Sequence, residues 1–282
     1  MNRLPAKPFN RTKIQSDPLQ YTPPMSTTIS RLITSFQSTG RMGRSTVQQA
    51  LISWFAFAGV EFSTIDCDSE HKPLSSWYPD IATFFPYRRD DDLLPILNLA
   101  GTGPVELIDF PAQATQSVLN ACHHFSALKI FEDKGIRLTI CIFASDERAA
   151  LASGAQIVST LGDGADYLVI SNPARFTSQV FFASKLAERL HDSPQIQIPR
   201  ITGGTIEALD RASKQKRKSL TFREAEPLLE IGSRYELEHW RNRLFSQFED
   251  NAAALLPDES LVRNKVVRAE EPLTQTINPF DL

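Results

Sequence analysis

A short loop that contains two glycines holds the residues of this chain best suited to bind phosphate. Gly40 and Gly43 allow a tight turn, and Arg44 follows them as a cation. Ser45 and Thr46 offer two hydroxyl groups at the point where a helix-like apolar stretch begins. Free N–H groups at a helix N-terminus favour an anion, and a hydroxyl there can hold magnesium. The spacing predicts a phosphate-binding loop, although an ordinary strand–helix turn capped by Ser45 fits the same residues.

Carboxylates stand at the ends of the next two strand-like segments. Asp66 and Asp68 follow residues 60–65, and Asp109 follows residues 105–108. Open α/β sheets bind ligands at the carboxyl ends of their strands, where an aspartate can orient a magnesium-bound or attacking water. A single aspartate there is also a common helix cap. The glycine-containing loop follows the first strand, and aspartates follow the second and third strands. Together they predict a site for a nucleotide and magnesium.

The middle of the chain alternates strand-like and helix-like segments, which predicts parallel β-α-β units. The strand segments are short, rich in Ile, Val, Leu and Phe, and typical of strands buried on both faces. We therefore expect an α/β fold with a mostly parallel central sheet flanked by helices. The expected strands are residues 29–36, 60–66, 105–109, 136–143, 167–171 and 195–198, and the expected helices are residues 45–58, 113–126, 147–161, 177–190, 205–213 and 234–256.

Both ends of the chain are polar and contain prolines, so they cannot bury enough apolar surface to order themselves. We expect flexible tails at residues 1–27 and 257–282 around one domain at residues 28–256. Hydrophobic residues make up 41% of the chain, which is typical of a globular domain. No apolar stretch is long enough to span a bilayer and no signal peptide is visible, so the expected location is the cytoplasm.

The spacing of the cysteines and histidines argues against two kinds of site. The three cysteines are far apart, and none of the five histidines has a metal-ligand spacing with an acidic partner, so neither a disulfide framework nor a zinc site is indicated. The net charge of −3 excludes a uniformly basic nucleic-acid binder. One basic cluster stands out and could contact DNA phosphates or form a solvated helix end: Lys214, Lys216, Arg217 and Lys218.

The order of the motifs resembles that of the deviant Walker A ATPases, the ParA/MinD family. Residues 39–45 resemble its K-G-G-x-G-K-[ST] loop, and residues 65–68 and 108–111 resemble its I-D-x-D and I-D-x-P segments. The resemblance covers residues 29–201 and implies a P-loop fold that binds ATP and Mg²⁺, with a nucleotide-dependent homodimer. It implies nucleotide contacts from Gly40, Arg41, Gly43, Arg44, Ser45, Thr46 and Asn172, magnesium contacts from Ser45 and Asp109, and an attacking water oriented by Asp68.

Two parts of this resemblance have alternative interpretations. Asn172 precedes a proline and is equally typical of a turn. In the loop, Thr39 occupies the place of the family's signature lysine, Arg41 that of its second glycine, and Arg44 that of its P-loop lysine. Arginine keeps the charge of lysine but not its compact ammonium group. We therefore expect nucleotide binding with weak ATP hydrolysis at most.

Two functions follow from the resemblance and from these departures. The first is a ParA-like nucleotide-dependent switch in plasmid partition, plasmid stability or conjugative transfer, with non-specific DNA contact or a plasmid-encoded protein partner. The second is a catalytically degenerate P-loop scaffold whose tails, including residues 278–282, recruit protein partners. A dehydrogenase or a serine hydrolase fits less well, because neither G-x-G-x-x-G nor G-x-S-x-G occurs where those folds need it.

Overall fold

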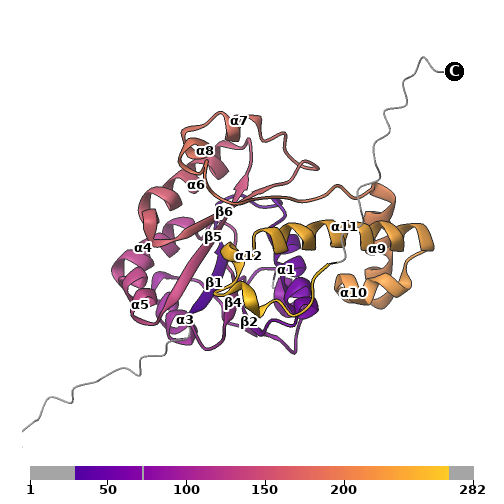
Figure 1. Ribbon diagram of the computed structural model, residues 1–282, viewed down its shortest axis with the longest axis horizontal. Helices are drawn as coiled ribbons and strands as arrows, with labels where there is room; N and C mark the ends of the chain where they lie inside the picture. The colour runs from indigo at the N-terminus through magenta and orange to yellow at the C-terminus, as the bar shows by residue number, and fades with distance from the viewer. Residues whose placement is uncertain (1–28, 72, 267–282) are drawn as a thin grey trace, which may run out of the picture.

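A seven-stranded parallel sheet forms the centre of the computed structural model, which describes residues 29–71 and 73–266 (Figure 1). The strand order is β3-β2-β4-β1-β5-β6-β7. All residues of β1 and β4 are buried, as expected for central strands that helices cover on both faces. The strands are β1 Ser30–Ser35, β2 Phe62–Asp66, β3 Ala82–Phe84, β4 Val105–Asp109, β5 Ile136–Ala144, β6 Asp166–Ser171 and β7 Gln195–Gln197.

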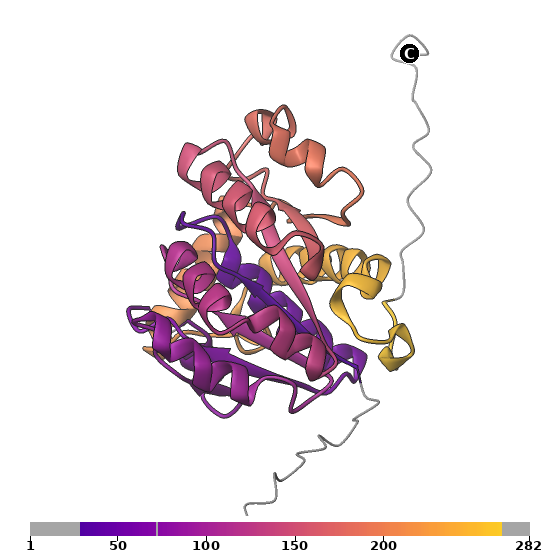
Figure 2. The ribbon, with the colours of Figure 1, turned by 90° about the vertical axis from the view of Figure 1, so that its left-hand side faces the viewer.

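Helices cover the two faces of the sheet and create two apolar cores, and the view in Figure 2 shows this layering. One core joins the sheet to α1 and α11, and the other joins it to the helices from α3 to α6. The helices are α1 Arg44–Ala58, α2 Pro73–Trp77, α3 Leu93–Leu99, α4 Thr115–His124, α5 Ala127–Asp133, α6 Arg148–Leu161, α7 Gln179–Phe182, α8 Lys185–Arg189, α9 Gly203–Lys216, α10 Phe222–Ala225, α11 Ile231–Asp250 and α12 Ala252–Leu255.

The parallel α/β architecture predicted from the sequence is confirmed, and all six expected strands are present within two residues at either end. The edge strand β3 was not expected, and neither were the short helices α2, α3, α5 and α10. The single helix expected over residues 177–190 is wrong. Ser184 is extended there and its hydroxyl caps α8 by accepting from Ala187 N, so α7 and α8 are separate.

The chain after α12 continues to pack against the domain. The N–H group of Arg263 donates to Ala58 O at 2.8 Å, and that of Val266 donates to Glu249 Oε1 at 2.6 Å. Residues 257–266 of the expected C-terminal tail therefore belong to the packed domain. The expected N-terminal tail and residues 267–282 lie outside the described residues. None of the described helices is both long and apolar enough to cross a membrane.

A buried arginine joins the centre of the sheet to the C-terminal helices. The Arg31 side chain on β1 is fully buried, donates from Nη1 to Thr139 Oγ1 at 2.9 Å, and forms an ion pair with Asp166. Its Nη2 donates to Ala253 O at 2.8 Å. Burial lowers the pKa of Arg31, while the hydrogen bond to Asp166 opposes that effect. The guanidinium thus fixes α12 against strands that lie far away in sequence.

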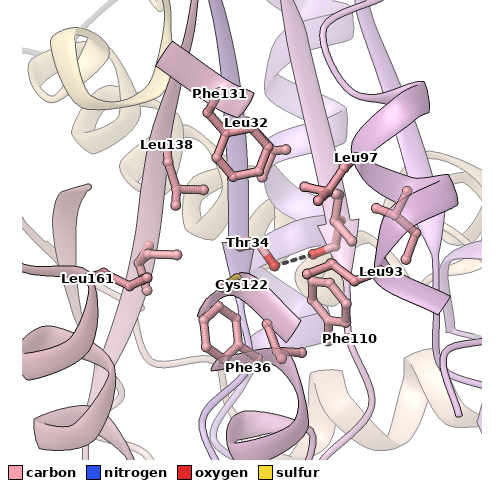
Figure 3. Close-up of a pocket in the computed structure, with 14 residues that line it drawn as sticks. Leu32, Thr34, Phe36, Leu93, Leu97, Phe110, Cys122, Phe131, Leu138 and Leu161 are labelled. Atoms are coloured by element: carbon pink, nitrogen blue, oxygen red, sulfur yellow. Dashed lines mark hydrogen bonds between the residues drawn. The ribbon is translucent and has the colours of Figure 1, made fainter. Parts of the chain in front are cut away.

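A small cavity lies inside the core between the sheet and helices α3 to α6. Its volume is about 30 Å³, and almost all of its lining side chains are apolar, including Leu32 and Leu97 (Figure 3). The hydroxyl group of Thr34 also lines the cavity, and it donates a hydrogen bond to Ile108 O at 2.9 Å. A water molecule needs two or more polar partners, which this lining does not offer. The cavity is therefore a packing defect of the core and not a ligand site.

Candidate functional site

The predicted phosphate loop is the connection between β1 and α1. Gly43 has a φ of 101° and precedes the first residue of α1, and no side chain caps the helix. The expected alternative, a turn capped by Ser45, is therefore not what the structure contains. The first N–H groups of an uncapped helix lack hydrogen-bond partners and carry the positive end of the helix dipole. This arrangement favours an anion in front of Arg44, Ser45 and Thr46.

Side chains hold the first half of the loop to the neighbouring strand and helix. Gln37 is buried, accepts a hydrogen bond from Phe143 N at 2.6 Å, and donates to Ala150 O at 3.1 Å. Ser38 N donates to Ser153 Oγ at 3.1 Å. These bonds connect the start of the loop, residues 37 and 38, to β5 and α6.

Asn172, at the end of β6, holds the second half of the loop. Its Nδ2 donates to Met42 O at 3.1 Å, and its side chain is buried. A methyl group added at Gly43 would lie 3.0 Å from Asn172 Nδ2 and 3.0 Å from Ile198 Cδ1. Gly43 is therefore needed both for its positive φ and for this close approach. The structure places Asn172 beside the loop, where its amide group donates a hydrogen bond to the loop backbone.

The strand ends that carry the predicted carboxylates meet in one row. Asp109 pairs in register with Ser35 on one side and with Asp66 on the other. The pKa of Asp109 is raised to about 7, mainly by burial; Arg44 opposes the rise, and the neighbouring carboxylates of Asp66 and Asp68 contribute to it. The structure thus places the aspartates predicted from the sequence together at the edge of the sheet where the loop begins.

Asp66 and Asp68 also bind backbone groups of their own segment. Asp66 accepts from Ser75 N at 2.7 Å, inside the first turn of α2, and Asp68 Oδ1 accepts from Glu70 N at 2.9 Å and His71 N at 3.0 Å. One oxygen of Asp68 is therefore engaged in the turn after β2. The predicted role of this carboxylate in orienting water would fall to its other oxygen.

Arg44 lies against the core instead of over the loop. Its side chain lines a space of about 10 Å³ between α1 and the sheet, together with Leu51 and Leu107. Burial lowers the pKa of Arg44, and the nearby carboxylates of Asp109 and Asp68 oppose that effect. The salt bridges within the described part of the chain do not include a direct pair between Arg44 and Asp109.

Several polar atoms at this site are buried and have no hydrogen-bond partner within the described residues. They are Ser35 Oγ at the tip of β1, Thr39 Oγ1 in the loop, and Arg44 Nη1 and Gln48 Oε1 on α1. A buried polar atom without a partner costs about 1–3 kcal/mol, so such atoms are rare and normally have a reason. Four of them beside one uncapped helix N-terminus fit a polar ligand or water bound here.

Ser45 and Thr46 are half-buried at the start of α1, and Gly40 and Arg41 are exposed at the tip of the loop. No group of three or more His, Cys, Asp or Glu that could hold a metal occurs in the part of the chain that the structure describes. A magnesium ion at Ser45 and Asp109 would therefore need phosphate oxygens or water as further ligands.

A cleft beside the loop contains residues that the sequence did not connect. It has a volume of about 740 Å³ and meets the loop at Thr46 and Asn172. Three members of the basic cluster that was a candidate for DNA contact line it, but Lys216 does not. Aromatic residues from three distant segments form another part of its wall: Trp77, Phe222 and Trp240. Because these residues are far apart in the sequence, no local pattern could have revealed the cleft.

No protein-family model matches the sequence, and no curated protein is significantly similar to it. Three solved structures are similar in fold. The MinD cell division protein of Aquifex aeolicus is 13% identical with a TM-score of 0.40, over 76% of this chain and 96% of that one. FlhF complexed with GMPPNP and Mg²⁺ is 13% identical with a TM-score of 0.40, over 61% and 66%. The signal recognition particle receptor FtsY of Elizabethkingia anophelis is 10% identical with a TM-score of 0.42, over 78% and 66%.

Proposed function

We propose that this chain binds ATP with Mg²⁺ at the loop between β1 and α1. The observation that carries the proposal is the uncapped N-terminus of α1, surrounded by buried polar atoms without partners on Ser35, Thr39, Arg44 and Gln48. Phosphate oxygens supply the acceptors and the negative charge that such a helix end favours. The hydrogen bonds that hold the start of the loop reduce the ordering entropy lost on binding.

Each residue of the loop has a role in this proposal. The N–H groups from Gly40 to Thr46 receive the phosphates, and Gly43 provides the backbone conformation that directs them. Ser45 and Asp109 hold the magnesium ion, which neutralises phosphate charge. A metal beside Asp109 favours its ionised form, so metal binding lowers the raised pKa of this carboxyl group.

Cations of this loop complete the site. Arg44 carries a buried charge with an unpartnered Nη1, and a phosphate within its reach offers a stronger partner than the core does. Arg41 is exposed at the loop tip, so it adds a second cation on the solvent side. The family resemblance suggests adenine as the base, and we place it beside Asn172.

We expect the protein to hydrolyse ATP only weakly. Asp68 orients the attacking water, but one of its oxygens accepts two hydrogen bonds in the turn that follows β2. The protein acts as a ParA-like switch in the cytoplasm, in plasmid partition, plasmid stability or conjugative transfer, and forms a homodimer with nucleotide bound.

A second function, a degenerate scaffold that binds nucleotide without turnover and recruits partners through its tails, is favoured by one observation. Thr39 stands where the related ATPases carry a lysine that reaches the partner subunit. Its side chain is buried and its hydroxyl points away from solvent. A buried, short side chain cannot reach a second subunit, so a dimer would need another contact.

Calorimetry with ATP, in Mg²⁺ or in excess EDTA, tests the proposal, with ATP turnover followed in the same samples with and without DNA. We expect binding that requires Mg²⁺ and that Ser45→Ala weakens by about tenfold, since the hydroxyl is lost from the metal. The control, Ser246→Ala on the half-buried surface of α11, should bind like the wild type. Absence of ATP binding at millimolar concentration would overturn the proposal, while binding without turnover would leave the scaffold as the function.

A further inference from the structure

The cleft next to the loop has the dimensions of a small-molecule site. Its volume of about 740 Å³ lies within the usual range of about 300–1,000 Å³ for ligand pockets. It is formed by α1, the segments after β6 and β7, and the group of α9, α10 and α11, which lies at one side of the molecule in Figure 1. The part of the cleft that Thr46 and Asn172 line adjoins the loop, and the rest of the cleft extends away from it.

The aromatic part of the wall is rigid. The indole of Trp240 is buried and its Nε1 donates to Pro199 O at 2.8 Å. Phe222 packs edge-on against this indole, with ring centroids 5.1 Å apart. Trp77, from α2, lines the cleft from another side. Fixed aromatic side chains favour the binding of a flat apolar body, because they lose little conformational entropy when a ligand arrives.

The basic part of the wall comes from the end of α9 and the residues that follow it. Lys214 pairs with Asp210 at 3.1 Å and Lys218 with Glu224 at 2.6 Å. Arg217 forms no salt bridge with any described residue and holds a left-handed conformation, with a φ of 54°. Near the end of α9, Lys214 O accepts from the N–H group of Arg217 and Ser213 O accepts from that of Lys218, which fixes the backbone that carries Arg217.

We propose that this cleft binds a small organic anion with an aromatic body, separately from the nucleotide at the loop. The aromatic part lies against Trp240 and Phe222, and the anionic group meets Arg217 and Lys214. The phosphates of the proposed nucleotide would lie at α1 and its base beside Asn172, at the edge of the cleft, whereas the anion proposed here lies at the end of α9. Arg175, after β6, adds a further exposed cation to the same cleft.

This assignment gives the basic cluster a different role from the two considered from the sequence, which were DNA contact and a solvated helix end. Lys214, Arg217 and Lys218 line a concave site with aromatic walls, whereas Lys216 faces elsewhere on the same helix end. A DNA duplex would contact the cluster through its net charge and would use all four residues alike. Lys216 is therefore a matched control, since it differs from Lys214 in position but not in charge.

Two fluorescent probes of the same shape test the proposal without magnesium or nucleotide. 8-Anilinonaphthalene-1-sulfonate carries an aromatic body and one negative charge, and N-phenyl-1-naphthylamine is its neutral counterpart. We expect saturable binding of both, with energy transfer from Trp77 and Trp240. In the double variant Lys214→Gln with Arg217→Asn, the affinity for the sulfonate should fall about tenfold, while that for the neutral probe should change less than about twofold. Asparagine is chosen at residue 217 because it tolerates the left-handed conformation.

The controls separate the outcomes. Lys216→Gln should bind both probes like the wild type, and Phe222→Leu should weaken both probes alike. Ser45→Ala should leave probe binding unchanged, so loss of nucleotide binding and loss of this site are distinguishable. Equal weakening of sulfonate binding by Lys216→Gln and by Lys214→Gln alone would point to general surface charge and DNA contact, and would overturn the proposal. Complete displacement of the sulfonate by ATP together with no effect of the double variant would also overturn it, because the cleft would then belong to the nucleotide.

Discussion

Replacement of Gly43 by alanine should damage the loop in two ways that can be measured separately. The backbone conformation, with a φ of 101°, costs a residue with a Cβ about 1–2 kcal/mol. The added methyl group would also approach Asn172 Nδ2 and Ile198 Cδ1 to 3.0 Å. To relieve this contact the amide must move away from Met42 O, and the hydrogen bond lost contributes about 1 kcal/mol. Gly43→Ala should therefore lower the free energy of unfolding by about 2–3 kcal/mol.

A double-mutant cycle in urea separates the two contributions. Asn172→Ala removes one side chain that the new methyl group would meet, so the cost of Gly43→Ala should shrink in that background by about 1 kcal/mol. Gly232→Ala is the control, because a methyl group there meets nothing within 4 Å. It should leave stability unchanged or raise it by less than about 1 kcal/mol, since alanine is the better helix former.

The same variants report on the ligand. Calorimetry with ATP and Mg²⁺ should show at least a tenfold loss of affinity in Gly43→Ala, because about 1.4 kcal/mol of loop distortion is enough for that factor. Gly232→Ala should bind normally. The reasoning is refuted if the effects of Gly43→Ala and Asn172→Ala add within about 0.3 kcal/mol, since the two residues would then not be coupled through the loop.

Three further outcomes follow from buried groups of the core. Arg31→Met should lower the free energy of unfolding by about 3 kcal/mol in urea, because it leaves carbonyls of α12 and Thr139 without their donor; a loss below about 1 kcal/mol would contradict the role given to Arg31. Val118→Ile adds a methylene that should partly fill the 30 Å³ cavity. It should raise the free energy of unfolding by at most about 0.8 kcal/mol, seen as a higher midpoint of thermal unfolding. A lower midpoint would show that the lining cannot accommodate the methylene. The pKa of Asp109 is raised to about 7 in the folded state, so the unfolded chain loses this proton first and stability falls as the pH rises from about 4 to about 7. Asp109→Asn should flatten that fall in urea titrations at pH 5 and pH 8, and an unchanged difference between the two pH values would refute the assignment.

The sequence predicts the central elements well because long, apolar, buried segments leave a clear pattern. β1, β4 and β5 are such segments, and the loop and aspartates at their ends lie where parallel strands must place them. β3 has three half-buried or exposed residues at the edge of the sheet, so its sequence contains no signal of burial. The helices α2, α7 and α10 have five residues or fewer, too short for a helical period to be recognised.

The sequence groups the residue types of the candidate site, but it does not predict the orientations of their side chains. Residues of one loop and two strand ends share an edge by topology alone, which is why Ser45, Asp68 and Asp109 could be grouped in advance. The inward direction of Arg44 depends on packing between α1 and the sheet, and the bond from Asn172 to Met42 depends on the end of β6. Asn172 and Met42 lie 130 positions apart, and β4 and β5, which line the same space as Arg44, are also distant from it in sequence, so no local pattern records these contacts.

The position of Arg31 has a consequence for synthesis on the ribosome. This residue lies in the first strand of the sheet, yet its partners Asp166 and Ala253 are translated more than 130 and 220 residues later. Until then, a nascent β1 that buried itself in a growing sheet would carry an unpaired charge into the apolar interior. The chain therefore gains little by folding its N-terminal half early, and the sheet should close around β1 only when the last helices have emerged from the exit tunnel.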